Sequence, residues 1–457
     1  MPREEVIVVG AGLTGLSAAW YLHQRGIPAL LLEAEGEVGG NVRSRAEGGF
    51  LRDLGPNSLM VKGELLPDMI RRLGLEDRVV EANPLARRRF VLNRKRRPVA
   101  LGPGVLLSSS LLSLSARLRL LSEPWRAARP ASHDDESIAD FVRRRLGPEA
   151  LAWLVDPFVS GVFAGDPEKL SVSAALPRLA SMEAESGSLL RAALRNRRTG
   201  KKGTGSRLVS FRSGLQELPM ALASALPPDR LQRSRAVIGI QHSEEGWRLQ
   251  TTGGELECRH LVLALPASEI ARLLRPLAAE LADELDSIFY PAVATIALGF
   301  PREAVAHPLD GFGLLIPRRL GIETLGVLFS STLFPERAPE GMVLLTAFLG
   351  GAQQDISQRS PAELEAQALR DLRPILGIRG DPSYHRCALW PRAIPQYALG
   401  HGERIARIHE LCRRLPNLDL LGNWQGGVAL GDCVAQANAF QKAFMEARTA
   451  TGQNEAP

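Results

Sequence analysis

The sequence predicts an α/β fold in which a nucleotide-binding βαβ unit opens the chain. Three features of the first 44 residues support this prediction. An apolar, β-branched run at 6–9 leads into Gly-x-Gly-x-x-Gly at 10–15, and an apolar run typical of a helix follows at 16–22. A second apolar run at 29–32 ends at Glu33, and the pair Gly39 and Gly40 comes shortly before Arg43. Strand, tight turn, helix and strand in this order form the first half of a Rossmann-like site.

Each glycine of the opening turn has a physical role in such a site. Gly10 permits the turn, Gly12 lets the backbone approach a pyrophosphate at the positive end of the helix, and Gly15 lets helix and strand pack closely. Glu33 stands where a carboxylate accepts hydrogen bonds from both ribose hydroxyls. The same charge repels a 2′-phosphate, so the sequence disfavours NADP.

The second glycine pair distinguishes between cofactors. Gly39 and Gly40 let another loop approach the same pyrophosphate, and the Arg43 guanidinium can bond it. NAD sites usually lack this second glycine loop with its arginine, so we expect bound FAD. The spacing from Glu33 to Ser44 resembles that of the flavin amine-oxidase and desaturase superfamily.

The composition is typical of a cytosolic enzyme. The 457 residues suffice for two or three domains, 45% of them are hydrophobic, and the mean hydropathy is −0.04. No run reaches the roughly 18 apolar residues that would span a bilayer, and the early first strand predicts no signal or transit peptide. The four cysteines lack metal-site spacing, so we expect reduced thiols and no metal.

The formal net charge of +6 comes mainly from arginine. Arginines gather at 87–97 and at 191–212, and the second stretch has the Gly and Ser of a mobile loop, so we predict it to be disordered. Aromatic residues are not interleaved with these charges, so we expect no nucleic-acid partner. The charge favours an anionic membrane surface or an anionic substrate instead.

A leucine-rich segment at 99–125 lies between the two arginine clusters. Two interpretations stay open for it. It is either a loop and helix packed inside a helical domain, or a surface whose apolar side chains enter a membrane while arginines meet the headgroups.

The rest of the chain predicts the domain organisation. Strands are predicted at 236–240, 247–251 and 261–265, strand-rich sequence at 290–348, and helices at 361–376 and 432–447. We predict an FAD-binding domain assembled from 1–85, 206–288 and 404–457. A helical, membrane-associating domain then occupies 86–205, and an inserted α+β substrate-binding domain occupies 289–403.

Seven segments resemble those of oxygen-dependent protoporphyrinogen oxidases, in the same order along nearly the whole chain. They are 55–58, 89–92, 156–171, 311–317, 334–335, 390–397 and 422–433. Gly431 departs from the pattern, because many relatives have Asn there.

The resemblance implies the residues that bind FAD. Val237 would contact adenine through its backbone, and Trp390 would border the flavin ring together with 428–430. The full set is Gly10, Gly12, Leu13, Thr14, Gly15, Glu33, Gly40, Arg43, Gly55, Pro56, Asn57, Ser58, Val237, Trp390, Val428, Ala429 and Leu430.

The resemblance also implies a porphyrinogen site. Arg89 would pair with a substrate propionate, and backbone groups between Gly161 and Gly165 would lie near the pyrrole nitrogens. Phe312, Leu315 and Phe334 would sandwich the macrocycle. No side chain is assigned as a catalytic base, and His401 is interpreted as a structural residue.

The implied reaction is the oxidation of protoporphyrinogen IX with oxygen as the final acceptor. The implied location is the cytoplasmic face of the cell membrane, with ferrochelatase considered as the product acceptor and a homodimer as the assembly. Coproporphyrinogen III oxidation and a non-catalytic flavin or porphyrin carrier remain alternatives. An amine oxidase is disfavoured because the strand at 292–298 has no lysine.

Overall fold

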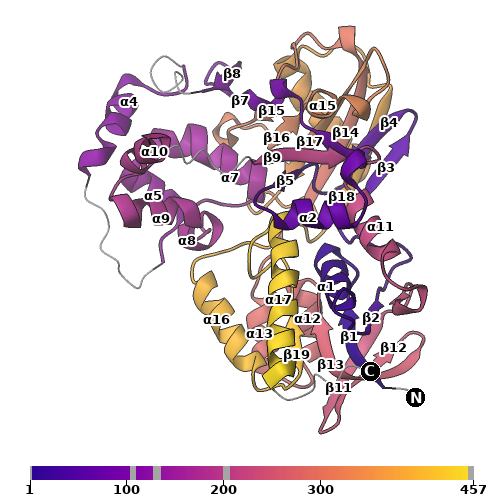
Figure 1. Ribbon diagram of the computed structural model, residues 1–457. Helices are drawn as coiled ribbons and strands as arrows, with labels where there is room; N and C mark the ends of the chain where they lie inside the picture. Colours follow the sequence, from indigo (N-terminus) through magenta and orange to yellow (C-terminus); the bar gives the residue numbers. More distant parts are fainter. Residues whose placement is uncertain (1–2, 103–109, 127–134, 199–205, 451–457) are drawn as a thin grey trace.

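The computed structural model describes residues 3–102, 110–126, 135–198 and 206–450, and it confirms the predicted α/β fold (Figure 1). The first sheet has the order β10 (Leu231–Gln232), β2 (Ala29–Leu32), β1 (Glu4–Val9), β13 (Gly254–Leu263), β12 (Gly246–Thr251), β11 (Val237–Ser243), and β19 (Leu418–Leu420) pairs with β13. Strands β10, β2, β1, β13 and β19 pair in parallel, whereas β11 and β12 extend the sheet as an antiparallel meander.

Both faces of this sheet are buried. Along β1, Val6 and Val8 point into one core, and Ile7 and Val9 point into the other. Parallel sheets are stable in this arrangement because helices cover both faces. Helices α1 (Leu13–His23), α2 (Leu65–Arg72), α11 (Glu217–Ser224) and α17 (Leu430–Ala450) cover the first face, and α12 (Ala267–Leu274), α13 (Ala279–Asp286) and α16 (His401–Cys412) cover the second.

The second sheet is antiparallel except for one pair. Its order is β18 (Tyr384–Trp390), β14 (Val293–Pro301), β17 (Met342–Gly350), β16 (Gly326–Leu328), β15 (Gly313–Leu315), β7 (Arg89–Leu92), β8 (Pro98–Leu101). Helix α15 (Pro361–Leu376) buries Leu364, Ala368 and Leu372 against it and begins with a capping box of Ser360 and Glu363.

The pairing of β7 corrects the predicted boundary at residue 86. β7 pairs in parallel with β15, and β8 pairs with β7, so 89–101 belong to the second sheet rather than to the helical domain. The physical reason is the alternation along β7, which sends Phe90 and Leu92 into the core of that sheet. A segment far away in the sequence thus completes the sheet edge.

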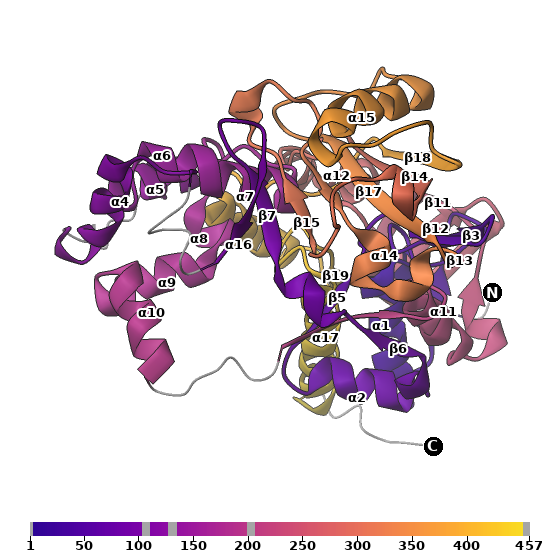
Figure 2. The ribbon, with the colours of Figure 1, turned by 90° about the horizontal axis from the view of Figure 1, so that it is seen from above.

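Residues 114–126 and 135–198 form a helical region to one side of the second sheet, where α7 contacts β15 (Figure 2). The helices are α4 (Leu114–Leu121), α5 (Ile138–Arg145), α6 (Pro148–Ala150), a π-helical turn η4 (Leu151–Val155), α7 (Asp156–Phe163), α8 (Val172–Ala175), α9 (Pro177–Ser186) and α10 (Leu189–Arg198), with the short η3 (Glu123–Trp125). Residues such as Ile138, Phe141 and Val159 form a separate core there.

The prediction of disorder at 191–212 is wrong for the described part of that stretch. Helix α10 extends to Arg198 and β9 (Arg207–Phe211) pairs with other strands, while 199–205 lie outside the described residues. The helix forms because Leu189 and Ala192 are buried and because Glu123 accepts hydrogen bonds from Ser188 and Leu189 at its start. Tertiary packing therefore overrides the loop-like composition.

Shorter elements connect these parts. β3 (Ser44–Glu47) and β4 (Phe50–Asp53) form a hairpin, and β9 pairs with both β5 (Leu59–Val61) and β6 (Val79–Glu81). The remaining elements are α14 (Ser330–Leu333), η1 (Glu76–Arg78), η2 (Pro84–Arg87), η5 (Pro228–Arg230), η6 (Arg302–Ala304), η7 (Arg318–Leu320) and η8 (Pro335–Arg337). Among the described residues, no helix combines the length and the apolar character needed to cross a bilayer.

Candidate functional site

The turn between β1 and α1 allows a very close approach of the backbone. Gly10 has φ of +101°, and a Cβ there would lie 2.5 Å from the Ala264 carbonyl oxygen. A Cβ at Gly15 would lie 2.0 Å from the Gly10 carbonyl oxygen. At Gly12 a Cβ would meet no atom within 4 Å, and no side chain caps α1. The positive end of the helix, at Leu13 and Thr14, therefore borders open space that suits a pyrophosphate.

The second glycine pair lies against this turn. Gly39 donates its N–H to the Ala11 carbonyl at 2.8 Å and forms a parallel bridge with Gly12. A Cβ at Gly40 would be 3.4 Å from the Gly12 Cα. The structure thus brings together the two glycine loops that the sequence separates by more than twenty residues.

Glu33 lies at the end of β2 beside the glycine turn. Its Oε2 accepts the Ala11 N–H at 2.8 Å, and its Oε1 accepts the Glu35 N–H at 2.9 Å. These bonds hold the carboxylate in place and leave lone pairs for ribose hydroxyls. The backbone N–H of Arg235 donates to the Glu33 carbonyl. Strand β11 begins two residues later at Val237, so this contact places the start of β11 near the end of β2.

Arg43 lies in the second glycine loop beside Glu35. Its guanidinium forms an ion pair with Glu35, while its Nε is buried without a hydrogen-bond partner among the described residues. The unpartnered Nε marks remaining capacity to bind an anion. Its contact with pyrophosphate stays a prediction.

The segment 55–58 is held against the second sheet. The Leu54 carbonyl accepts hydrogen bonds from the Thr295 hydroxyl at 2.7 Å and from the Trp390 indole at 2.8 Å. A Cβ at Gly55 would lie 2.1 Å from the Asn41 carbonyl oxygen, and the Asn57 amide donates to the Gly55 carbonyl. Pro56 and Ser58 belong to the same segment. Trp390 and this segment therefore lie side by side, as expected for two parts of one flavin site.

Residues 428–430 lead into the amino end of α17. Val428 and Leu430 are half-buried, and Ala429 is exposed and donates its N–H to Asp432 at 3.2 Å. Helix α17 packs beside α1, and the Thr14 side chain is hydrogen-bonded to the Cys433 thiol (Figure 1). Two helix amino ends thus meet at the glycine turns, a donor set that fits the phosphates and ring of FAD.

The predicted substrate residues lie along β7, β15 and α7. Arg89 is exposed, with its guanidinium carbon 5.0 Å from the centre of the Phe312 ring. A Cβ at Gly161 would lie 2.4 Å from the Leu315 Cδ2, so a larger residue there would have to displace the end of that side chain. At Gly165 a Cβ would collide with Leu170 and with the Gln396 side chain. The structure therefore groups Arg89, Phe312, Leu315 and Gly161.

Phe334 differs from this group because it is only 3% exposed. It packs with Ala86 and Leu333, and half-buried Phe312 contacts the same cluster. The guanidinium carbon of Arg337 lies 5.4 Å from the Phe334 ring centre. The ring lines a small cavity of about 10 Å³ together with Asn57 and Leu333, and its contact with a macrocycle stays a prediction.

Sequence reasoning missed the buried pair of Asp53 and Arg337, whose side chains are both 3% exposed and 2.9 Å apart. Arg337 follows the quoted 334–335 segment by two residues, but nothing local identifies a partner almost 300 residues away. Asp53 also accepts the Leu215 N–H at 2.9 Å.

His401 is a buried neighbour of the flavin-bordering turn. It is 3% exposed, its ring lies 4.2 Å from that of Tyr397 at 12°, and neither ring nitrogen has a hydrogen-bond partner among the described residues. Burial lowers its pKa from 6.5 to about 4. An imidazole kept neutral by packing fits the expected structural role.

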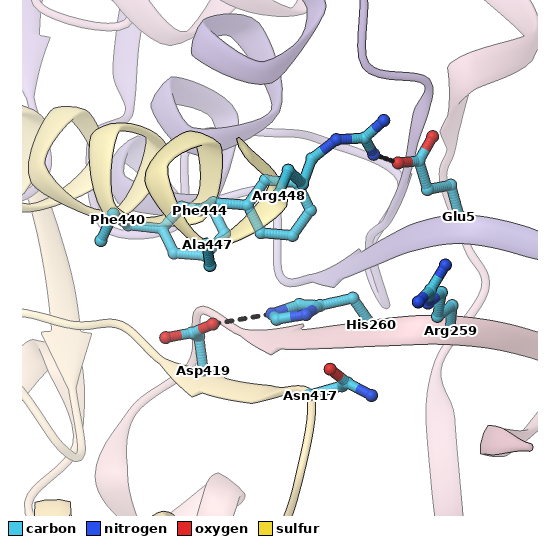
Figure 3. Close-up of a pocket in the computed structure, with 10 residues that line it drawn as sticks. Glu5, Arg259, His260, Asn417, Asp419, Phe440, Phe444, Ala447 and Arg448 are labelled. Atoms are coloured by element: carbon cyan, nitrogen blue, oxygen red, sulfur yellow. Dashed lines mark hydrogen bonds and ion pairs between the residues drawn. The ribbon is translucent and has the colours of Figure 1, made fainter. Parts of the chain in front are cut away.

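A separate pocket of about 300 Å³ lies at the opposite end of the first sheet (Figure 3). His260 points toward Asp419 at 2.7 Å, Arg448 pairs with Glu5, and Phe444 meets the His260 ring edge-on. Glu5 is near the start of β1, whereas the glycine turn follows its end. Cofactors of such sheets bind beyond the carboxyl ends of the strands, so this pocket is not the flavin site.

Known proteins resemble the chain over almost its full length. Residues 13–438 match the model of the family described as flavin containing amine oxidoreductase. The chain is 35% identical over 465 residues to protoporphyrinogen oxidase 1 (chloroplastic) of Arabidopsis thaliana, covering 95% of this chain and 86% of that protein. It is 29% identical over 464 residues to coproporphyrinogen III oxidase of Bacillus subtilis, covering 96% and 97%. A crystal structure from Exiguobacterium sp., named as a provisional protoporphyrinogen oxidase, matches with a TM-score of 0.85 and 25% identity, covering 97% and 99%.

Replacing Glu33 tests the cofactor site. Because the substitution removes the ribose acceptor, Glu33→Ala should weaken FAD binding roughly 10- to 100-fold. The flavin-to-protein ratio after dialysis and the dissociation constant of the apoprotein measure this. Glu37→Ala is the matched control, since Glu37 is exposed and pairs with Arg45 at the surface. Purification of the wild type with NAD in place of flavin would contradict the assignment.

Replacing His401 tests the buried imidazole. Below pH 6.5 the unfolded chain binds a proton at this residue, whereas the folded protein binds it only near pH 4. The contribution of His401 to the free energy of unfolding is therefore fully present above about pH 6.5 and is lost as the pH falls toward 4. His401→Phe keeps a stacked ring without a titrating group, so between pH 7.5 and 4.5 it should lose about 2 to 3 kcal/mol less unfolding free energy than the wild type. Urea unfolding at both pH values measures this, and equal losses in the two proteins would show that His401 titrates normally.

Proposed function

The chain belongs to the flavin containing amine oxidoreductase family, and we propose that this FAD-dependent oxidoreductase converts protoporphyrinogen IX to protoporphyrin IX. The observation that carries the proposal is the group of Arg89, Phe312, Leu315 and Gly161, where β7 pairs with β15 and α7 lies against Leu315. It combines an apolar, partly aromatic surface with one exposed cation, which suits a flat macrocycle carrying carboxylates on one side. The names of the relatives point the same way.

The reaction removes six electrons in three two-electron steps, and bound FAD supplies the hydride acceptor for each step before oxygen reoxidises it with release of peroxide. The protein therefore has to orient the macrocycle and exclude water. Arg89 would hold a propionate, and the close contact of Gly161 with Leu315 would give backbone groups of α7 access to the pyrrole edge. Trp390, whose indole donates to the Leu54 carbonyl, would border the flavin ring where the ring meets the substrate.

Arg89 can pair with one substrate carboxylate. Arg88 is already paired with Asp310, and Arg337 is buried with Asp53. No carboxylate of the described residues pairs with Arg89. A protoporphyrinogen has two carboxylates and a coproporphyrinogen has four, and the neighbouring Arg87 is exposed as well, so turnover has to distinguish the two substrates.

Turnover of the two porphyrinogens side by side tests the function. We expect kcat/KM for protoporphyrinogen IX to exceed that for coproporphyrinogen III by tenfold or more, with peroxide formed as porphyrin appears. Faster oxidation of coproporphyrinogen III would reverse the substrate assignment. Anaerobic mixing separates an enzyme from a carrier, because only an enzyme has its yellow colour bleached by the substrate.

We also propose that α4 touches an anionic membrane at the cytoplasmic face of the cell. Leu114, Leu118 and Leu121 recur on one side of the helix and are 71%, 59% and 50% exposed, and nearby Trp125 is 80% exposed. Half-buried Arg117 and Arg119 on the same helix offer charge to headgroups. The earlier part of this surface, 103–109, lies outside the described residues. Ferrochelatase as a product acceptor and a homodimer stay predictions.

Vesicle flotation tests the membrane contact. The protein should float with vesicles containing anionic phosphatidylglycerol at low salt and be released at high salt, because electrostatic attraction is screened. Leu118→Ser combined with Trp125→Ser should reduce the bound fraction several-fold, whereas the exposed pair Ile238→Ser and Leu277→Ser, outside the helical region, should not. Equal flotation of both double variants would refute the assignment to α4.

Replacing Arg89 tests the substrate anchor. A charge-assisted pair contributes roughly 1.5 to 3 kcal/mol, so Arg89→Ala should raise KM for protoporphyrinogen about 10- to 100-fold with normal flavin content. Steady-state kinetics of Arg87→Ala and Arg88→Ala provide the controls. Equal small effects in all three variants would indicate a diffuse basic surface without a specific anchor.

A further inference from the structure

The strap at residues 396–400, between the second sheet and α16, contacts the helical region. The Ser171 N–H donates to the Tyr397 carbonyl at 2.9 Å, and Leu170 and Ala398 form an antiparallel bridge. The Gln396 side-chain amide donates to the Phe163 carbonyl at 2.9 Å, at the end of α7. The strap is therefore fixed to the end of α7, which carries Gly161, and to the following loop, which carries Gly165.

The Tyr397 side chain extends from this strap to the turn that precedes α17. Its hydroxyl donates to the Asn423 carbonyl and accepts the Gly427 N–H at 2.9 Å. Tyr397 is only 5% exposed. One hydroxyl thus bridges both ends of the turn at 423–427, immediately before the residues predicted to border the flavin.

These two backbone groups depend on the hydroxyl. Among the described residues, neither the Asn423 carbonyl nor the Gly427 N–H has another hydrogen-bond partner. Gly427 has φ of +120°, and a Cβ there would lie 2.3 Å from the Asp432 carboxylate. The turn therefore combines a backbone conformation that favours glycine with a bridge from another part of the chain, and loss of the bridge would leave polar groups unsatisfied.

The bridge is held by packing and protonation. The Tyr397 ring stacks on His401 at 4.2 Å, which fixes the direction of the hydroxyl. Burial raises the pKa of Tyr397 well above its usual value, so the hydroxyl keeps the proton that it donates to Asn423.

From this geometry we propose that Tyr397 is a positioning residue for the cofactor. Its hydroxyl sets the turn at 423–427 and thereby the place of Val428, Ala429 and Leu430 against the flavin. Through its own carbonyl it ties this turn to the helices on the substrate side. The inference concerns FAD binding, so it does not depend on which porphyrinogen is oxidised.

Tyr397→Phe tests the bridge because it keeps the stacked ring and removes only the hydroxyl. The dissociation constant of FAD, measured on the apoprotein by fluorescence quenching, should rise about tenfold. Amide exchange of the peptide at 421–432 should accelerate by a similar factor, and far-ultraviolet circular dichroism should not change. In the loaded enzyme kcat should fall while KM for the porphyrinogen stays within about twofold.

Tyr384→Phe is the matched control, since Tyr384 is also buried and stacked, on Phe50 at 4.7 Å, but lies away from this turn. It should leave FAD affinity unchanged. His401→Phe keeps the hydroxyl and should also bind FAD normally. Unchanged affinity and exchange in Tyr397→Phe would overturn the inference.

Two further outcomes keep the inference falsifiable. If Tyr397→Phe does not accumulate, rapid exchange of the Gly427 amide in wild-type protein, at the rate of a free peptide, would overturn it. Failure to oxidise protoporphyrinogen would overturn the proposed function and leave the effect on FAD intact, so the two failures are distinguishable.

Discussion

The buried ion pair of Asp53 and Arg337 is the interaction that fixes the β3–β4 hairpin to the segment leading into β17 of the second sheet. Asp53 ends β4, and Arg337 ends the short helix η8. Asp53 also accepts hydrogen bonds from Ser44 and Leu215, and Arg337 donates to Ser210. Removing one partner would leave a charge inside the protein, which costs about 3 to 5 kcal/mol. The pair thus connects the second glycine loop, the return strand β9 and the substrate side.

Leu54 follows Asp53 directly and links this ion pair to the predicted flavin site. The Leu54 carbonyl accepts hydrogen bonds from the Thr295 hydroxyl in β14 and from the Trp390 indole in β18. Two strands of the second sheet therefore hold the segment that begins at Gly55, while the first sheet presents Glu33 and the glycine turns. Because the cofactor performs the redox chemistry, the buried hydrogen bonds of this chain serve to position the segments that would bind the cofactor. His401 illustrates the same point, since its imidazole is packed and neutral.

The helical region meets the second sheet through a shared apolar cluster and through smaller contacts. Leu112, Ala116 and Trp153 of the helical region pack with Val91 of β7, and Leu315 of β15 packs against the same cluster. Gly161 also lies against Leu315, and the strap at 396–400 bonds to Ser171. A further core lies within the helical region, where the fully buried Arg145 pairs with Glu123. The exposed leucines of α4 lie on this same region, so an apolar surface and the glycine-bearing side of the cleft belong to one packed unit.

The sequence by itself determined the features that depend on neighbouring residues. Strand, glycine turn and helix at 6–22, the carboxylate Glu33 and the capped helix α15 are all local, because periodicity, missing Cβ atoms and caps act within a few residues. Tertiary structure decided the pairing of β7 with β15, the burial of Phe334, the pairing of Arg43 with Glu35 and the reach of Tyr397 to Asn423. Helix α10 forms although the composition of this stretch is typical of a loop, because its apolar side packs into the core of the helical region. Such outcomes depend on which distant surfaces meet, and no local pattern in the chain encodes that choice.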